Sequence, residues 1–279
     1  MRLFSILGLA LLGLALHVPA HATGKVLVVS VHPYQPTRAL IAYHEHLAAH
    51  LRATLKRPVR IVTAKSVRAF GTRILAGEYE LVLGPGHLLR LAQRERGWHP
   101  LARYVPDTPL LLLARSDAGD LTVDALKGRT LASPGRVRLA GRAAETWLAE
   151  RQLLPGRDFE VLDAGTPASA IHALVSGEAD MAVATLASMS QARRDEVAQL
   201  RIVEELAPVP LLFFAARPDV SPAMRARLQR ALLAYATPQG IRPVVATEQE
   251  LAAMDVYLDQ TRQLLQGQPD AEPERRASQ

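Results

Sequence analysis

The chain has 279 residues, of which 49% are hydrophobic and 22% are charged, so it is a globular protein long enough for one large domain or two lobes. Its formal net charge of +6 favours anionic partners, but only 5% of the residues are aromatic and no dense basic run occurs, which argues against nucleic acid. Cysteine is absent, which excludes disulfides, thiolate catalysis, cysteine metal sites and a lipid-anchoring cysteine.

Residues 1–22 have the pattern of an export signal. Arg2 precedes an apolar run at 3–16, and the small residues of 20–22 surround the expected cleavage site. An uncleaved anchor helix is the alternative, but the run is short for a membrane span and is followed by Pro19. We therefore expect cleavage and a soluble mature chain in the periplasm.

The following segments alternate between strand-like and helix-like patterns. The apolar, β-rich runs predict strands at 25–31, 59–64, 79–84, 100–105 and 109–115. Apolar residues at helical spacing predict helices at 37–55, 66–77 and 85–95. Such alternation implies a parallel sheet covered by helices.

The pattern then restarts, which predicts a second α/β unit. Its expected strands and helices lie at 123–128, 129–133, 138–151, 159–164, 167–177 and 179–185. Apolar segments at 200–206 and 210–216 close this unit, and helices at 221–236 and 247–265 follow.

We therefore expect an α/β fold of two lobes with parallel or mixed sheets. Two crossing segments near 106–114 and 204–212 would form the hinge, and a cleft between the lobes is the natural ligand site. The polar residues 266–279 contain prolines and little to bury, which predicts a disordered tail. The expected boundaries are 24–108 with 208–265 for lobe 1, and 109–207 for lobe 2.

Enzyme signatures are absent: the sequence has no GxSxG elbow, phosphate loop, dinucleotide fingerprint or HExxH motif. We expect no catalysis and no cofactor, with an unrecognised hydrolase as an alternative. His46 and His50 lie four residues apart with His44 nearby, a spacing that can share a metal. A polar helix face is the other interpretation, and because no third ligand is in register we expect no metal site.

Two turns have the layout of an anion site. In 79–89 (YELVLGPGHLL) a strand ends in Gly-Pro-Gly and turns directly into a helix, and 131–141 (LASPGRVRLAG) repeats this layout in the second unit. The first amides of a helix attract anions, so two such turns facing one cleft would clamp a small oxyanion. Either turn alone could be a solvated loop. The loop at 32–36 adds His32 and Tyr34 at the same edge, where Tyr34 could contact a ligand or pack on the neighbouring turn.

The order of these segments resembles the phosphonate-binding-protein-like family of periplasmic solute-binding proteins of ABC importers. The similarity is carried in order along the chain by VSVHPYQPTRAL, LAGEYELVLGPGHLL, LKGRTLASPG, AIHALVSGEADMAVAT and RPDVSPAMRARLQRALL. It implies a type II periplasmic binding protein fold, a monomer without catalysis, a small anionic ligand and an ABC permease as membrane partner. By position in that family, the ligand would be faced by Tyr34, Gly86, His87, the turn from Ser133 to Arg138 with Arg136, and Thr185.

The sequence also departs from the family pattern. The turn at Ser133 has arginines where phosphonate-binding members have hydroxyls, His87 is close to the usual position of an aromatic, and 208–210 is the apolar Pro-Val-Pro where an acidic or polar residue is common. An anion other than a phosphonate, held by Arg136 or Arg138, is therefore an open alternative. A sensory or partner module that reports a ligand to a membrane kinase or a redox system is the other functional hypothesis.

Overall fold

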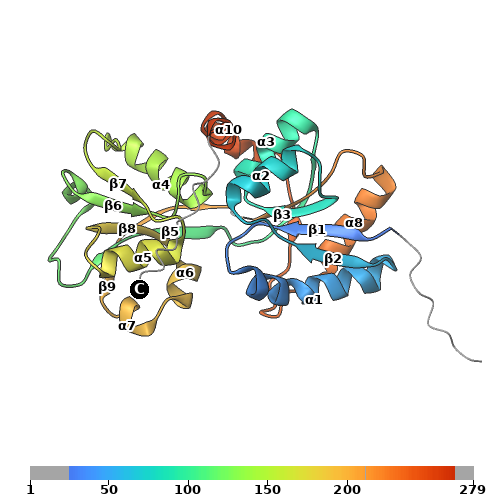
Figure 1. Cartoon of the computed structure of the whole chain (residues 1–279), viewed down its shortest axis with the longest axis horizontal. Helices are drawn as coiled ribbons and strands as arrows, with labels where there is room; N and C mark the ends of the chain where they lie inside the picture. Colours follow the sequence, from blue (N-terminus) through green and yellow to red (C-terminus); the bar gives the residue numbers. More distant parts are fainter. Residues whose placement is uncertain (1–24, 211, 268–279) are drawn as a thin grey trace, which may run out of the picture.

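The computed structural model describes residues 25–210 and 212–267, which form two α/β units side by side (Figure 1). The expected signal at 1–22 lies outside these residues, as does all of the expected tail beyond 267. We use lobe 1 for the elements around the six-stranded sheet and lobe 2 for those around the five-stranded sheet.

Lobe 1 is built from two parts of the chain. Its first part comprises β1 (Leu27–Val31), α1 (Thr37–Leu55), β2 (Val59–Val62), α2 (Val67–Leu75), β3 (Leu81–Gly84), α3 (Gly86–Arg96) and β4 (His99–Arg103). Its second part comprises β10 (Phe213–Ala216), α8 (Pro222–Ala234), β11 (Val244–Val245), α9 (Glu248–Ala252), the 3₁₀ helix η2 (Ala253–Tyr257) and α10 (Leu258–Gln266).

Lobe 2 is one continuous segment. It comprises β5 (Thr108–Arg115), the 3₁₀ helix η1 (Val123–Leu126), β6 (Thr130–Ser133), α4 (Leu139–Glu150), β7 (Glu160–Asp163), α5 (Pro167–Val175), β8 (Met181–Thr185), α6 (Leu186–Gln191), α7 (Arg194–Val197) and β9 (Leu200–Val209).

Both sheets are mixed. The strand order is β11-β4-β10-β3-β1-β2 in lobe 1 and β7-β6-β8-β5-β9 in lobe 2. In lobe 1, β1 is parallel to β2 and β3, while β10 runs antiparallel between β3 and β4. In lobe 2, β6 is parallel to β7 and β8, and β5 is antiparallel to β8 and β9. The carboxyl ends of β1, β3 and β6 therefore open into loops that precede α1, α3 and α4.

Alternation along the central strands explains why helices cover both faces of each sheet. In β1, Leu27, Val29 and Val31 are fully buried among residues of α1 and α8, whereas the intervening Val28 packs against the core on the other face. Strands buried on two faces are apolar throughout, as the unbroken leucine run of β5 illustrates.

The two connections between the lobes run beside each other. Thr108 at the start of β5 is the register partner of Val209 at the end of β9, and the Tyr104 amide donates to the Leu212 carbonyl at 3.1 Å. The chain thus crosses twice within one narrow region, as the sequence predicted.

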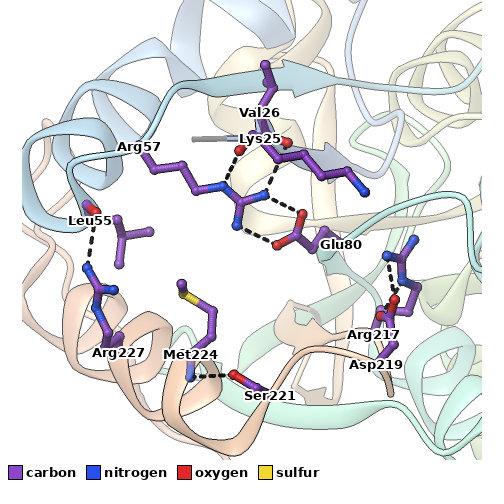
Figure 2. Close-up of polar contacts among 10 residues, drawn as sticks. All are labelled: Lys25, Val26, Leu55, Arg57, Glu80, Arg217, Asp219, Ser221, Met224 and Arg227. Atoms are coloured by element: carbon purple, nitrogen blue, oxygen red, sulfur yellow. Dashed lines mark hydrogen bonds and ion pairs between the residues drawn. The ribbon is translucent and has the colours of Figure 1, made fainter. Parts of the chain in front are cut away.

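A cluster of polar contacts around Arg57 ties the lobe 1 sheet together at the amino ends of its strands, opposite those loops (Figure 2). Arg57, between α1 and β2, forms a two-bond ion pair with Glu80 at 2.6 and 2.7 Å and donates to the Lys25 and Val26 carbonyls before β1. Both charged side chains are largely buried, with 14% of Arg57 and 15% of Glu80 exposed. The cluster connects the entrances of β1, β2 and β3.

The predicted single helix at 247–265 is interrupted in the structure by η2. Leu251, Met254 and Tyr257 are all buried and lie three residues apart. Side chains at that spacing align in a 3₁₀ helix but drift around an α-helix, so burial of all three favours the tighter turn. The short elements α6, α7 and β11 were not predicted.

Candidate functional site

The loops that follow β1, β3 and β6 meet where the two lobes touch, and we call this region the cleft site. Two side chains make hydrogen bonds across it from lobe to lobe. His87 in α3 contacts the Val137 carbonyl at 2.9 Å, and the Arg138 guanidinium lies 3.5 Å from the Pro33 carbonyl. The two helix starts that the sequence singled out, before α3 and α4, are therefore brought together.

A third contact between the lobes lies beside the cleft site. Arg142 in α4 is 4% exposed, and it donates to Gln260 of α10 at 2.9 Å and to Glu145 at 3.1 Å. Figure 1 shows α10 at the boundary between α4 and α3. Sequence reasoning did not select Arg142; the signal available was an arginine on the otherwise apolar face of 139–148.

His87 is the second residue of α3 and is 1% exposed. Burial lowers its pKa to about 4; the bond to Val137 opposes this shift and the charge of Arg142 adds to it. The imidazole is therefore neutral at neutral pH. Its Nδ1 atom is buried and has no hydrogen-bond partner among the described residues.

His32 and Tyr34 form a ring pair in the loop after β1, with centroids 5.1 Å apart. Burial, with repulsion from Arg138 and then from His87 and His44, lowers the pKa of His32 to about 3. The Tyr34 hydroxyl lies 2.9 Å from His44 Nε2, and burial raises the pKa of that hydroxyl. Tyr34 thus lies in the loop after β1 with its hydroxyl already bonded to His44.

The turn after β6 places its two arginines differently. Arg136 is exposed, and its backbone amide donates to Asp163 at 3.3 Å. Arg138 is half-buried, and its Nε donates to the Gly165 carbonyl at 2.7 Å in addition to the contact with Pro33. Burial lowers the pKa of Arg138, and the charge of Asp163 opposes this. The described hydrogen bonds of the Arg138 side chain all go to backbone carbonyls.

Ser133, at the end of β6, is 1% exposed, and its hydroxyl has no partner among the described residues. Gly135 in the same turn has a φ of 111°, a conformation that glycine adopts readily. The turn packs against the first residues of α4, where Gly141 approaches Ser133 and Gly135 closely. Ser133 thus offers a buried hydroxyl in the turn that precedes α4.

Gly86 and Thr185 complete the predicted set. Gly86 is buried at the start of α3, and an added Cβ would lie 3.0 Å from Phe213. Thr185 caps α6, where its hydroxyl accepts from the Ser188 amide at 3.1 Å and the Ser188 hydroxyl accepts from the Thr185 amide at 2.9 Å. No described contact joins Thr185 to His87 or Arg138.

Two of the histidines considered for metal binding have other contacts. His44 bonds Tyr34, and His50 lies 2.8 Å from the Ala231 carbonyl. Within 25–210 and 212–267, no group of three or more histidine or acidic side chains is arranged to hold a metal ion. Nor does any helix of these residues have the length and apolarity needed to cross a membrane.

A separate cavity of about 480 Å³ lies beside the two crossing segments. It is bounded by α4, by 208–210 and by α9 with η2, and it includes Trp147, Glu150 and Tyr257. None of the residues predicted from the sequence to contact a ligand lines it.

Comparison with known proteins identifies a family. The family described as ABC transporter, phosphonate, periplasmic substrate-binding protein matches residues 29–255. No curated protein matches the chain.

Solved structures share the fold. PhnD1 of Prochlorococcus marinus in complex with methylphosphonate has a TM-score of 0.72 at 14% identity, covering 86% of this chain and 98% of that one. A binding-protein component of an ABC phosphonate transporter from Pseudomonas aeruginosa has a TM-score of 0.72 at 13% identity, covering 88% and 91%. A Xanthomonas citri protein bound to chloride ion has a TM-score of 0.66 at 19% identity, covering 86% and 99%. The periplasmic binding protein fold expected from the sequence is confirmed.

Proposed function

This chain belongs to the family of periplasmic substrate-binding proteins of ABC phosphonate transporters, and from that premise we propose that its cleft site captures a small oxyanion for import. Membership of this family implies the periplasm as the compartment, a small ligand and a membrane permease as the partner. The transporter family favours import over the sensory role. We further propose that the protein acts as a monomer without catalysis and that residues 1–22 are a cleaved export signal.

The observation that carries the proposal is that Arg138 and His87 make contacts across the lobe boundary, from or to the same turn that carries Ser133. Arg138 brings a guanidinium whose hydrogen bonds go to carbonyls, so within the described part of the chain its positive charge has no bonded carboxylate. Ser133 adds a buried hydroxyl without a partner, and α3 and α4 both begin at this point. An oxyanion would supply the missing negative charge and acceptors.

Magnitudes favour direct hydrogen bonds over helix dipoles as the source of affinity. A helix terminus contributes about 0.3–1 kcal/mol, whereas a hydrogen bond to a charged group contributes about 1.5–3 kcal/mol. Arg138 and Ser133 therefore provide most of the binding energy in this proposal. Tyr34 and Gly86 shape the wall, Arg136 acts from the exposed rim, and Thr185 contacts a ligand only if its bonds to Ser188 open.

Lobe movement would admit the ligand. The bonds from His87 to Val137 and from Arg138 to Pro33 must break for the cleft site to open, and the paired crossing segments are the natural axis for that motion. Closure around the ligand would then bury its charge between fixed dipoles.

The experiment is a calorimetric and thermal-shift screen of the mature protein against phosphonates, phosphate esters, sulfonates and inorganic anions. A ligand at about 100 times its Kd stabilises the folded state by about 2.7 kcal/mol. The matched variants are Arg138→Met and Arg136→Met: the first should weaken binding at least about tenfold, and the second, which removes an exposed charge, by less than about threefold. Failure of every anion to bind, or unchanged binding by Arg138→Met, would refute the proposal.

A further inference from the structure

The cleft site contains one hydrogen-bonding atom whose role is set by the other lobe. His87 reaches across the boundary with Nε2, which lies 2.9 Å from the Val137 carbonyl oxygen. A carbonyl oxygen only accepts hydrogen bonds, so Nε2 must carry the proton. The neutral ring has a single N–H, and Nδ1 is therefore a bare acceptor.

This acceptor is buried and unsatisfied. His87 Nδ1 is out of contact with solvent and has no hydrogen-bond partner among the described residues. Ser133 Oγ is also buried without a partner, but a hydroxyl can either donate or accept and so does not discriminate between ligands. When the single proton of a neutral imidazole is on Nε2, Nδ1 can only accept a hydrogen bond.

Resting on the proposed function of the cleft site, we propose that His87 Nδ1 accepts a hydrogen bond from the bound anion and so selects oxyanions that carry a hydroxyl proton. The monoanion of a phosphonate or of a phosphate monoester has such a P–OH group. A sulfonate or sulfate of similar shape has none at neutral pH. Binding one of these would leave Nδ1 buried against acceptor oxygens, and an unpaired buried polar group is the strongest basis for rejecting an analogue.

The charges around His87 favour a hydroxyl over an ammonium group as the donor. Arg142 from α4 raises the positive potential at His87, and Arg138 does the same at the neighbouring His32. The carboxylate of Asp163, at the end of β7, already accepts from the Arg136 and Gly165 amides. A cationic donor would meet repulsion here, whereas a P–OH group belongs to the anion that Arg138 attracts.

The direct test compares methylphosphonate with methanesulfonate, which have similar shapes and differ in the acidic proton. At pH 5, calorimetry on the wild-type protein should show methylphosphonate binding about 10- to 100-fold more tightly. Methyl phosphate tests the proton itself. Because the second pKa of a phosphate monoester is about 6, its affinity should fall about tenfold per pH unit above that value, while any binding of methanesulfonate stays flat.

Two variants separate the acceptor from the contact between the lobes. In His87→Gln the side-chain amide can still donate to Val137 but no acceptor remains at the Nδ1 position, so the preference for methylphosphonate should fall to within about threefold. In His87→Asn the shorter amide can offer its oxygen near the Nδ1 position and cannot reach Val137, so overall affinity should fall while the preference persists. Circular dichroism verifies that both variants fold.

The comparison of methylphosphonate with methanesulfonate on the wild-type protein tests the role of His87 Nδ1 even if a variant does not fold. Equal affinity for methylphosphonate and methanesulfonate overturns this inference while leaving the proposed function intact. Tighter binding of 2-aminoethanesulfonate than of methylphosphonate also overturns it, because the donor would then be an ammonium group. If no oxyanion binds, the proposed function itself fails.

Discussion

The substitution Gly141→Ala tests whether the turn after β6 is as tightly packed as the structure shows. Gly141 lies in the first turn of α4, and an ideal Cβ built there would be 2.7 Å from the Gly135 carbonyl oxygen and 2.8 Å from Ser133 Oγ. Ordinary carbon–oxygen contacts are about 3.3–3.6 Å, so the turn must move by roughly 0.6 Å or more. The first obstacle is backbone, which cannot rotate away as a side chain can.

Two effects of opposite sign determine the result. Alanine is favoured over glycine inside a helix by about 1 kcal/mol, whereas forcing an extra methyl group into a packed region costs about 1–3 kcal/mol or more. We expect a net loss of about 1–2 kcal/mol, which corresponds to a fall in Tm of roughly 2–8 °C for a protein of this size. Anion affinity should fall as well, because the same turn carries Val137 and Arg138.

Gly71→Ala is the matched control. Gly71 is also a helical glycine, in α2, and its added Cβ would lie 2.9 Å from Leu265 and 3.1 Å from Leu88. These atoms are the tips of flexible leucine side chains, which can rotate, so the gain in helix propensity offsets the contact and Tm should stay within about 2 °C. Differential scanning calorimetry measures both variants. Equal melting temperatures for Gly141→Ala and wild type would refute the packing argument.

Three further predictions concern stability. Arg57→Met leaves the partly buried Glu80 without its partner and should cost about 2 kcal/mol in urea unfolding, whereas Arg193→Met, which removes a surface ion pair, should leave the midpoint unchanged. His87 has a folded pKa of about 4, below the 6.5 of an unfolded chain, so only the unfolded state takes up a proton on this group as the pH falls from 6.5 to 5. The free energy of unfolding should therefore fall by about 2 kcal/mol over that range because of His87. His87→Gln should remove this part of the pH dependence. Thr185→Ala removes the cap of α6 and should cost about 1 kcal/mol, with ligand affinity unchanged if the hydroxyl serves the helix and reduced if it contacts ligand.

Local pattern was sufficient for most of the fold. Buried strands such as β3 and long amphipathic helices such as α1 carry enough residues for their periodicity to be recognised, and α1 was predicted with the bounds that the structure shows. The missed elements are those with too few residues to show a period, such as the two-residue strand β11 and the single turn of α7. The break at η2 was missed because it depends on three side chains that become buried only when the lobe assembles.

The two helix starts that meet at the lobe boundary were singled out by sequence, but the arrangement of their side chains was not. The two helix starts follow from local strand–turn–helix patterns. Which arginine faces inward depends on the contact between Arg138 and Pro33, which lie 105 positions apart, and sequence reasoning treated Arg136 and Arg138 alike. The proton position on His87 depends on Val137, 50 positions away. Such long-range contacts leave no periodic signal in a single sequence.

The place of β10 in lobe 1 has a consequence for the order in which the protein folds. β10 lies between β3 and β4, so the six-stranded sheet has a gap at its centre until the chain has been made, or has crossed a membrane, as far as Ala216. Lobe 2 needs only the continuous segment from Thr108 to Val209 and can assemble first. Until β10 inserts, β3 and β4 each present an unpaired edge, and such edges are where strands from other chains add. During synthesis and export, therefore, lobe 1 is the half of the molecule that most needs protection from aggregation.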